Sequence, residues 1–155
     1  MADVPPRLPA RRRLLVSGLL LGAGVAGAVD EIVFHQLLHW HHFYDRASGA
    51  AGLVSDGLLH AATFSAAVAG TALLADARRR GPFLRPLWWG AVLTGAGVFQ
   101  VWDGVVHHKL LRLHQVRYGV DLTGYDVGWV LPGALLLGAG VVLLLRSRAR
   151  PAAVR

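Results

Sequence analysis

The chain of 155 residues contains no cysteine, and its single methionine is Met1. The absence of cysteine excludes disulfide bonds and thiolate metal sites, and it leaves the redox compartment undetermined. Without thiolates or internal thioethers, the sequence also lacks the soft ligands that favour Cu(I). Acidic residues are scarce as well, with nine against 16 lysines and arginines, and the net charge is +7. Any metal chemistry must therefore rely on nitrogen and oxygen ligands.

Hydrophobic residues make up 54% of the chain and fall in long runs. Four runs, residues 14–33, 58–75, 87–106 and 127–145, each have about the 20 residues needed to cross the hydrocarbon core of a bilayer. None shows the period-two alternation of a barrel strand, and hydrocarbon cannot satisfy a bare backbone, so each run is expected to be a helix. The sequence predicts an all-α, four-helix transmembrane bundle over residues 14–145.

The cations are distributed unevenly around these runs. Twelve of the 16 precede the first run, separate the second from the third, or follow the fourth: Arg7, Arg11, Arg12, Arg13, Arg78, Arg79, Arg80, Arg85, Arg146, Arg148, Arg150 and Arg155. The other side holds Arg46, Lys109, Arg112 and Arg117. The positive-inside rule therefore predicts cytoplasmic N and C termini, with basic segments at residues 1–13 and 146–155. Topology accounts for the basic charge, and the sequence contains no recognisable nucleic-acid module.

An internal copy appears when the sequence is offset by 73 residues. Asp30, His35 and His41 then align with Asp103, His108 and His114, in the shared pattern D-x-[IV]-V-x-H-x-L-L-x-x-H. A weaker match pairs Asp56 with Asp126. We expect two tandem two-helix repeats, residues 14–76 and 87–145, related by an axis along the membrane normal. The mid-chain copy also argues against a cleavable signal peptide at the first run.

Ionisable residues cluster at one depth of the predicted helices. A rise of about 1.5 Å per residue places one set of side chains near the outer leaflet: Asp30, His35, Asp56, His60, Asp103, His108 and Asp126. Ionisable groups at that depth cost several kcal/mol unless they are paired or hydrated. The sequence therefore predicts a functional polar layer.

Imidazoles combined with carboxylates suit Zn, Fe or Cu(II). The predicted metal ligands or ligand-orienting residues are His35, His60, His108, Asp30, Asp56 and Asp103. Secondary candidates are His41, His42, His107, His114, Glu31, His39 and Asp126. No HExxH or Glu-x-x-His motif identifies the metal.

Other interpretations of these residues remain open. His35 and His108 could be the axial ligands of one haem, or the same metal site could serve a membrane oxidoreductase with an open coordination position. A closed structural network of Asp and His is a further alternative. A proton or ion pathway is disfavoured because the inner halves of the runs lack ionisable residues.

Two purely structural interpretations, which involve no metal, concern smaller groups of these residues. His39, His41, His42 and His114 fit interfacial side chains in water, the interpretation we favour for this group. Asp56 and Asp126, each just before an apolar run, fit helix N-caps.

The motifs DEIVFHQLLHWHH, DGLLHAATF, WDGVVHHKLLRLHQVRYG and YDVGW together resemble the bacterial domain-of-unknown-function 2243 family of predicted membrane proteins. The resemblance covers nearly the whole chain apart from its arginine-rich ends. It carries the family pattern onto Asp30, His35, His41, His42, Asp56, His60, Asp103, His108, His114, Arg117 and Tyr118. Glu31 replaces a typical glycine, and His39 and His107 replace common glutamines, which shifts the expected site to the two-fold Asp/His set.

The resemblance implies a multi-pass protein of a bacterial plasma membrane, whose partners are lipid and respiratory or metal-assembly membrane proteins. Because genes of the family sometimes lie near oxidase-assembly factors, it also implies metal handling. The resulting hypothesis is an outward-facing Asp/His metal site in a four-span membrane protein.

Overall fold

The structure of the protein is a computed structural model that describes residues 10–148. The expected basic segments therefore fall partly outside the described residues, at positions 1–9 and 149–155. The elements in chain order are α1 (Ala10–Asp30), π-helix η1 (Glu31–Leu37), α2 (Gly49–Arg80), α3 (Arg85–Trp102), π-helix η2 (Asp103–Leu110) and α4 (Leu122–Arg148). The predicted all-α fold with four long helices is confirmed.

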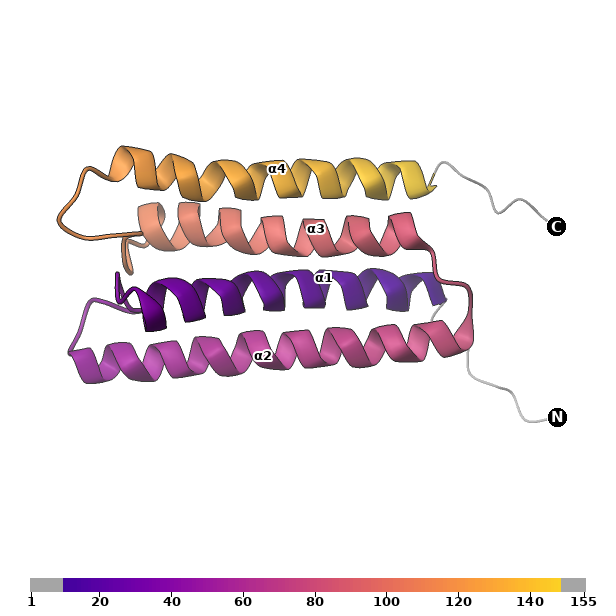
Figure 1. Ribbon diagram of the computed structural model, residues 1–155, viewed down its shortest axis with the longest axis horizontal. Coiled ribbons are helices and arrows are strands. Elements are labelled where there is room, and N and C mark those ends of the chain that lie inside the picture. The colour runs from indigo at the N-terminus through magenta and orange to yellow at the C-terminus, as the bar shows by residue number, and fades with distance from the viewer. Residues whose placement is uncertain (1–9, 149–155) are drawn as a thin grey trace.

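The four helices form a row rather than a square bundle (Figure 1). Helix α1 packs against α2 and α3, and α3 also packs against α4. In the part of the chain that the structure describes, α2 and α4 do not contact each other. The outer helices consequently leave large apolar side chains exposed, including Leu53 and Phe64 in α2 and Leu135 in α4. An exposed apolar surface of this extent suits lipid rather than water.

Within residues 10–148, three helical segments are long and apolar enough to cross a membrane: Ala10–Leu37, Gly49–Arg80 and Leu122–Ser147. The segment predicted at residues 87–106 is not among them, because Gln100, Asp103 and several tryptophans interrupt its apolar run. Helix α3 nevertheless lies between α1 and α4 along the length of the molecule (Figure 1). The central position of α3 explains how Gln100 and Asp103 are tolerated, since Gln100 is partly buried and Asp103 is buried, whereas Trp89 and Trp102 remain exposed.

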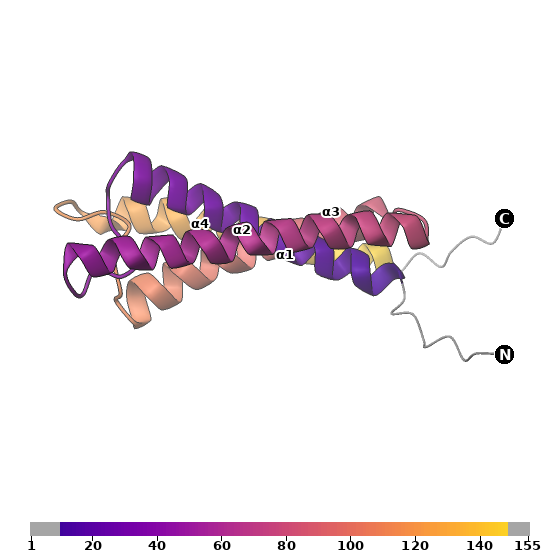
Figure 2. The ribbon, with the colours of Figure 1, turned by 90° about the horizontal axis from the view of Figure 1, so that it is seen from below.

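Helices α1 and α3 cross near their middles and diverge toward their ends (Figure 2). Two glycines permit the close approach. A Cβ at Gly22 would lie 2.0 Å from the carbonyl oxygen of Val92, and a Cβ at Gly95 would lie 2.2 Å from that of Leu19. Both glycines and both carbonyl residues are separated by 73 positions, from 22 to 95 and from 19 to 92. The crossing of α1 and α3 therefore contains the same contact between a glycine and a carbonyl group twice, once with the glycine on each helix.

The outer helices pack on the central ones through a second recurring contact. A Cβ at Gly24 of α1 would lie 2.7 Å from the carbonyl oxygen of Thr63 in α2. A Cβ at Gly97 of α3 would lie 2.7 Å from that of Gly133 in α4. Small residues at such positions let helix backbones approach closely in membranes. The pair α1 and α2 thus packs in the same way as the pair α3 and α4.

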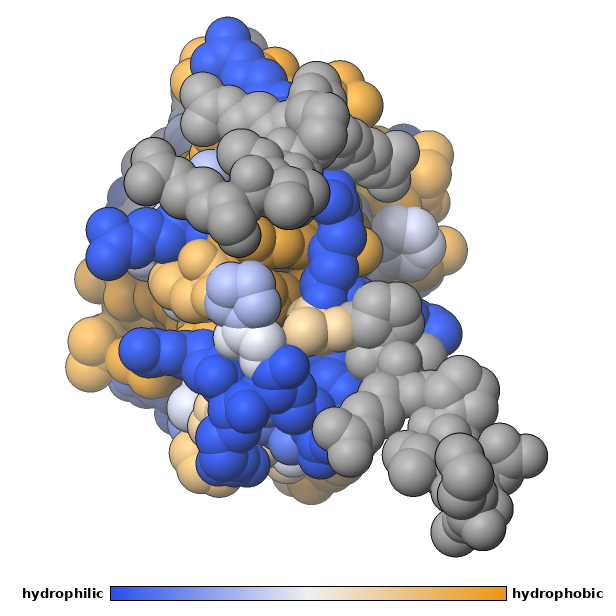
Figure 3. All heavy atoms as spheres, turned by 90° about the vertical axis from the view of Figure 1, so that its right-hand side faces the viewer, coloured by the Kyte–Doolittle hydropathy of each residue, from blue (hydrophilic) through white to orange (hydrophobic). Residues whose placement is uncertain are grey.

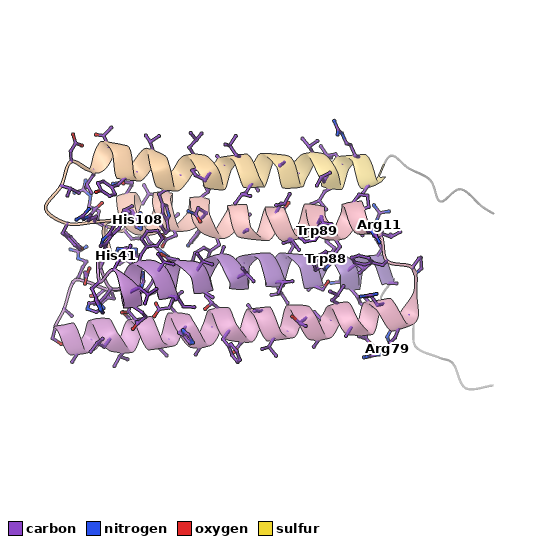
Figure 4. All side chains as sticks on the ribbon, in the orientation of Figure 1. Arg11, His41, Arg79, Trp88, Trp89 and His108 are labelled. Atoms are coloured by element: carbon purple, nitrogen blue, oxygen red, sulfur yellow. The ribbon has the colours of Figure 1, made fainter. Side chains whose placement is uncertain are left out.

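The two ends of the row differ in chemistry. At the end where α1 begins and α4 ends, which we call the termini end, hydrophilic side chains surround an apolar centre (Figure 3). Exposed arginines there are Arg11, Arg12, Arg78, Arg79, Arg80, Arg85 and Arg146. At the other end, which we call the loop end, residues 38–48 and 111–121 connect the helices, and His41 and His108 lie close together (Figure 4). The predicted polar layer lies at this loop end.

Candidate metal centre

The ends of α1 and α3 change from α-helix to π-helix at the aspartates. Asp30 is the last residue of α1 and precedes η1, and Asp103 is the first residue of η2. Residues five positions apart lie well around an α-helix from each other, but a π-helix, with its i to i+5 hydrogen bonds, brings them onto one face. Asp30 and His35, and likewise Asp103 and His108, are five positions apart. The π-turns therefore bring each aspartate next to its histidine.

In the first half of the chain, Asp30, His35 and His41 converge. The Nε2 atom of His35 lies 3.8 Å from Oδ1 of Asp30, and the rings of His35 and His41 have centroids 4.4 Å apart. One ligand atom from each of the three residues lies within 4.8 Å of the others, and all three residues are buried. Donors bound to one Zn ion at about 2.1 Å lie about 3 to 4 Å apart, so small adjustments would let these residues share an ion.

In the second half, Asp103, His108 and His114 converge. The Nε2 atom of His108 lies 3.0 Å from Oδ2 of Asp103 and 2.9 Å from Nε2 of His114. The Nε2 atom of His114 lies 3.7 Å from Oδ1 of Asp103. Two imidazole nitrogens and a carboxylate oxygen therefore face one point. A cation held at this point would contact all three side chains.

Crossed hydrogen bonds to the main chain fix His41 and His114. The Nδ1 atom of His41 donates to the carbonyl oxygen of Val116 at 2.8 Å, and Nδ1 of His114 donates to that of Phe43 at 2.8 Å. Because a carbonyl oxygen only accepts, the proton of each neutral imidazole is on Nδ1, and Nε2 keeps its lone pair. A hydrogen bond of this kind sets the tautomer of a metal-ligating histidine. Each half of the chain thus orients a histidine of the other half.

Burial keeps these two histidines neutral. Burial, together with the neighbouring His114 and His35, lowers the pKa of His41 to about 3. Burial likewise lowers the pKa of His114 to about 4, against an opposing effect of Asp103. Both imidazoles are therefore uncharged at neutral pH and available as ligands.

A carboxylate cluster supports His35 from behind. The Nδ1 atom of His35 donates to Oδ1 of Asp56 at 3.0 Å and lies 2.9 Å from Oε2 of Glu31. Asp56 also accepts from Nδ1 of His42 at 2.6 Å and from the main-chain nitrogen of Phe43 at 2.7 Å. Since the Nδ1 proton points to the carboxylates, Nε2 of His35 faces Asp30 with its lone pair free. Asp56 therefore orients His35 and connects α2 to the loop.

Several buried atoms in the centre lack a hydrogen-bond partner. Among the described residues, both carboxylate oxygens of Asp30 and the Nε2 atoms of His35 and His41 are buried without a donor. Buried polar atoms are nearly always paired, and each unpaired one costs about 1–3 kcal/mol. Four converging acceptors without a donor are the pattern expected of a cation site.

The structure gathers most of the predicted site residues at the loop end. Asp30, His35, Asp103 and His108 line the centre, and Asp56 and Glu31 lie behind His35. His107 donates from Nδ1 to Oδ1 of Asp103 at 3.0 Å, and Lys109 bonds Asp126 at 2.6 Å. His42 is half-buried against Asp56, whereas His39 is exposed. His60 is exposed on α2 and belongs to none of the described clusters.

Two interpretations from the sequence are wrong. His41 and His114 are not interfacial residues in water, because the loops fold back over the diverging ends of α1 and α3 and leave these side chains 5% and 1% exposed. Asp56 and Asp126 are not N-caps, because α2 begins at Gly49 with Ser48 as its cap and α4 begins at Leu122. Both aspartates lie inside their helices.

The π-helices and the crossed loop bonds were missed from the sequence. A spacing of five between Asp and His in both copies was the available signal for the π-turns. No sequence pattern indicates that the carbonyl groups of Phe43 and Val116 bind the histidines, since any residue supplies a carbonyl.

Comparison with known proteins gives one informative result. No curated protein and no solved structure matches the chain. A family model described as "Predicted membrane protein (DUF2243)" matches residues 17–147, which include most of α1, all of α2 and α3, all but the last residue of α4, and both loops of the centre. The protein therefore belongs to the domain-of-unknown-function 2243 family of predicted membrane proteins.

Proposed function

We propose that this integral membrane protein holds two transition-metal ions at its loop end. One ion is bound by Asp30, His35 and His41, and the other by Asp103, His108 and His114. The observation that carries the proposal is the convergence of buried acceptor atoms without donors in the first set. The second set has the same residue types 73 positions later and similar contacts.

Two ions fit the geometry better than one. Among the groups of potential metal ligands in the described residues, Asp30, His35 and His41 form one and His41, His108 and His114 form another, and no group contains both His35 and His108. Asp103 lies 3.0 Å from His108 and 3.7 Å from His114 and supplies the carboxylate of the second ion. His41 has one free nitrogen, because Nδ1 donates to Val116, and so it can serve one ion. Each ion then has two histidines and one aspartate, a set found in non-haem iron sites and, with glutamate as the carboxylate, in catalytic zinc sites.

The ligand count favours chemistry over a purely structural role. Structural zinc sites use four protein ligands, whereas catalytic sites keep a position open for water or substrate. Three ligands for each ion leave such positions. A closed structural network explains the centre less well, because it would pair the atoms that remain unpaired. A bis-histidine haem is disfavoured because His41 and His114 fill the space beside His35 and His108.

Orientation in the membrane follows from the charges at the two ends. The exposed arginines at the termini end support a cytoplasmic location for both termini, so that the centre faces outward. The two halves, with their recurring contacts, then form tandem repeats. Because the chain has no cysteine, the orientation can be tested with a membrane-impermeant maleimide on cells that carry Ala47→Cys at the loop end or Pro82→Cys at the termini end. Labelling of Ala47→Cys alone is expected, and the reverse pattern would contradict the topology.

Metal handling, such as delivery to a respiratory oxidase, is a second candidate function. A cavity of about 360 Å³ at the loop end is lined by His39, Trp40, His41, His42, Asp45 and Tyr118. It connects additional imidazoles and a carboxylate to His41, a ligand of the first ion. In a delivery protein a soluble chelator should remove the ions within minutes, whereas a resident centre should retain them through dialysis.

The decisive experiment is elemental analysis and an optical spectrum of the purified, full-length protein. We expect about two equivalents of metal for each chain and no Soret band. His35→Ala combined with His108→Ala should reduce the metal content below half an equivalent, and His60→Ala, a histidine outside the centre, should leave it unchanged. A Soret band would replace the proposal with haem, and wild-type protein without metal after growth in Fe, Zn and Cu would refute it.

A further inference from the structure

A second cavity lies beside the metal centre, between the two halves at the loop end. Its volume is about 580 Å³, within the range of small-molecule sites. Aromatic rings of Phe34, Trp40, Tyr125 and Trp129 line it, together with Gly124 and Gly128 of α4. Four aromatic side chains in one cavity offer flat apolar surfaces for a ring-shaped ligand.

The ring of Trp129 separates this cavity from His108, a proposed ligand of the second ion. The ring of Trp129 has its centroid 5.6 Å from that of His108 and 5.0 Å from that of Phe34. A molecule in the cavity would therefore lie one side chain away from His108, a proposed ligand of the second ion.

Glycines form an open wall on the α4 side. A Cβ added at Gly124 or Gly128 would meet no atom within 4 Å. The two glycines are four positions apart, about one turn of the helix, and so lie on the same face. Helix packing does not require glycine at either position, in contrast to Gly22 and Gly95. The wall instead lets a flat molecule approach the helix backbone.

The polar groups that line the cavity include the hydroxyl of Tyr125 and the carboxylate of Asp121. Nη1 of Arg117 donates to the hydroxyl of Tyr125 at 2.7 Å, so the hydroxyl hydrogen is free to donate to a ligand. Arg117 also lies over the ring of Trp40, at 5.0 Å from its centroid, which holds that wall in place. Asp121 lines the same cavity, and bonds from Thr123 lower its pKa, so that it is an ionised acceptor at neutral pH.

We propose that this cavity binds a lipid-soluble ring with oxygen substituents, of the quinone or phenol class, as a substrate or electron partner of the metal centre. The aromatic walls and the glycine face accommodate the flat ring. The hydroxyl of Tyr125 donates to a ring oxygen, and Asp121 accepts from a ring hydroxyl. The role of the bound molecule as a substrate or electron partner rests on the proposed metal centre, whereas its binding in the cavity does not.

The test uses the quenching of tryptophan fluorescence by 2-methyl-1,4-naphthoquinone in the detergent-solubilised, full-length protein. Trp40 and Trp129 line the cavity, so we expect a saturable component above the linear quenching that partition into the micelle produces. Gly128→Leu places a side chain in the cavity and should weaken the saturable binding by about tenfold or more. Gly138→Leu is the matched control, because its Cβ also meets no atom within 4 Å and Gly138 does not line the cavity.

A second variant provides an independent test in case the Gly128→Leu protein does not fold. Tyr125→Phe keeps the ring and removes the donor, and it should weaken the binding by about fivefold. Strictly linear quenching, or equal binding by the Gly128→Leu and Gly138→Leu variants, would overturn the proposal. Displacement of the probe by a saturated fatty acid at equal concentration would also overturn it, in favour of an acyl chain.

Metal content measured on the same samples separates the two proposals. Saturable binding by protein without metal would leave the cavity assignment intact and refute the metal centre. Two equivalents of metal with linear quenching would refute the cavity assignment alone.

Discussion

The two halves of the chain present the same three ligand types but support them differently. In the first half, Nδ1 of His35 is held by Asp56, with Glu31 beside it. In the second half, Nδ1 of His108 is buried without a partner among the described residues, and Asp126 binds Lys109 instead. The position that corresponds to Glu31, at an offset of 73, is Gly104, and a Cβ there would lie 2.7 Å from the ring of Trp129.

The difference assigns separate tasks to the two halves. Carboxylates behind His35 fix the tautomer and position of that proposed ligand, an arrangement that raises the affinity of a histidine for a cation. In the second half the glycine admits Trp129, whose ring lies between His108 and the aromatic cavity. We infer that the first half binds its ion more tightly, and that the second half contacts the organic ligand. A symmetric scaffold thus carries an asymmetric site.

The largest expected effect concerns the scaffold that the halves share. Gly22→Ala and Gly95→Ala should each destabilise the protein toward the upper end of the about 1–3 kcal/mol that overpacking costs, because the new Cβ would meet a backbone carbonyl at 2.0 or 2.2 Å. Thermal unfolding in detergent measures the loss. Gly57→Ala is the control, because its Cβ meets no atom within 4 Å, and it should not destabilise. If only one of Gly22→Ala and Gly95→Ala destabilised the protein, the two glycine contacts at the crossing of α1 and α3 would not be equivalent.

The next effect is the loss of one ion at a time. His35→Ala should remove the first ion and leave the second, and His108→Ala should do the opposite, so each variant keeps about one equivalent of metal. Each substitution leaves only two protein ligands for its ion, too few for stable binding. Elemental analysis after dialysis gives the stoichiometry. If either single variant lost all its metal, the ligands would form one shared centre, and the comparison between halves would fail.

Much of this architecture was predictable from local sequence. Long apolar runs fix helices in lipid, because no other short-range structure satisfies the backbone there. The estimated height of each residue along its helix correctly predicted that Asp30, Asp56, Asp103 and Asp126 lie at one end of the molecule. His60 was assigned by the same argument, but height alone does not specify the direction of a side chain. Its position on α2 turns it away from the centre.

The rest depended on contacts that no local pattern contains. His41 and His114 looked like interfacial residues, yet hydrogen bonds to carbonyl groups 75 and 71 positions away hold them inside. The row arrangement likewise follows from which glycine faces which backbone. The Asp and His motifs indicated the proposed chemistry, and the pairing of the two loops placed His41 and His114 in the proposed ligand set.

The smallest expected effect tests the support behind the ligands. Asp56→Asn removes the charged acceptor of His35, so we expect the affinity of the first ion to fall by about 10- to 100-fold, the usual cost of losing such a partner. Asp126→Asn is the matched change in the second half. Because Asp126 bonds Lys109 rather than His108, it should leave both affinities within about threefold of the wild type. Competition with a chelator of known affinity, followed by elemental analysis, measures both variants. Equal losses at the two positions would mean that Asp126 also supports its histidine in the metal-bound protein, and that the asymmetry between the halves disappears when metal binds.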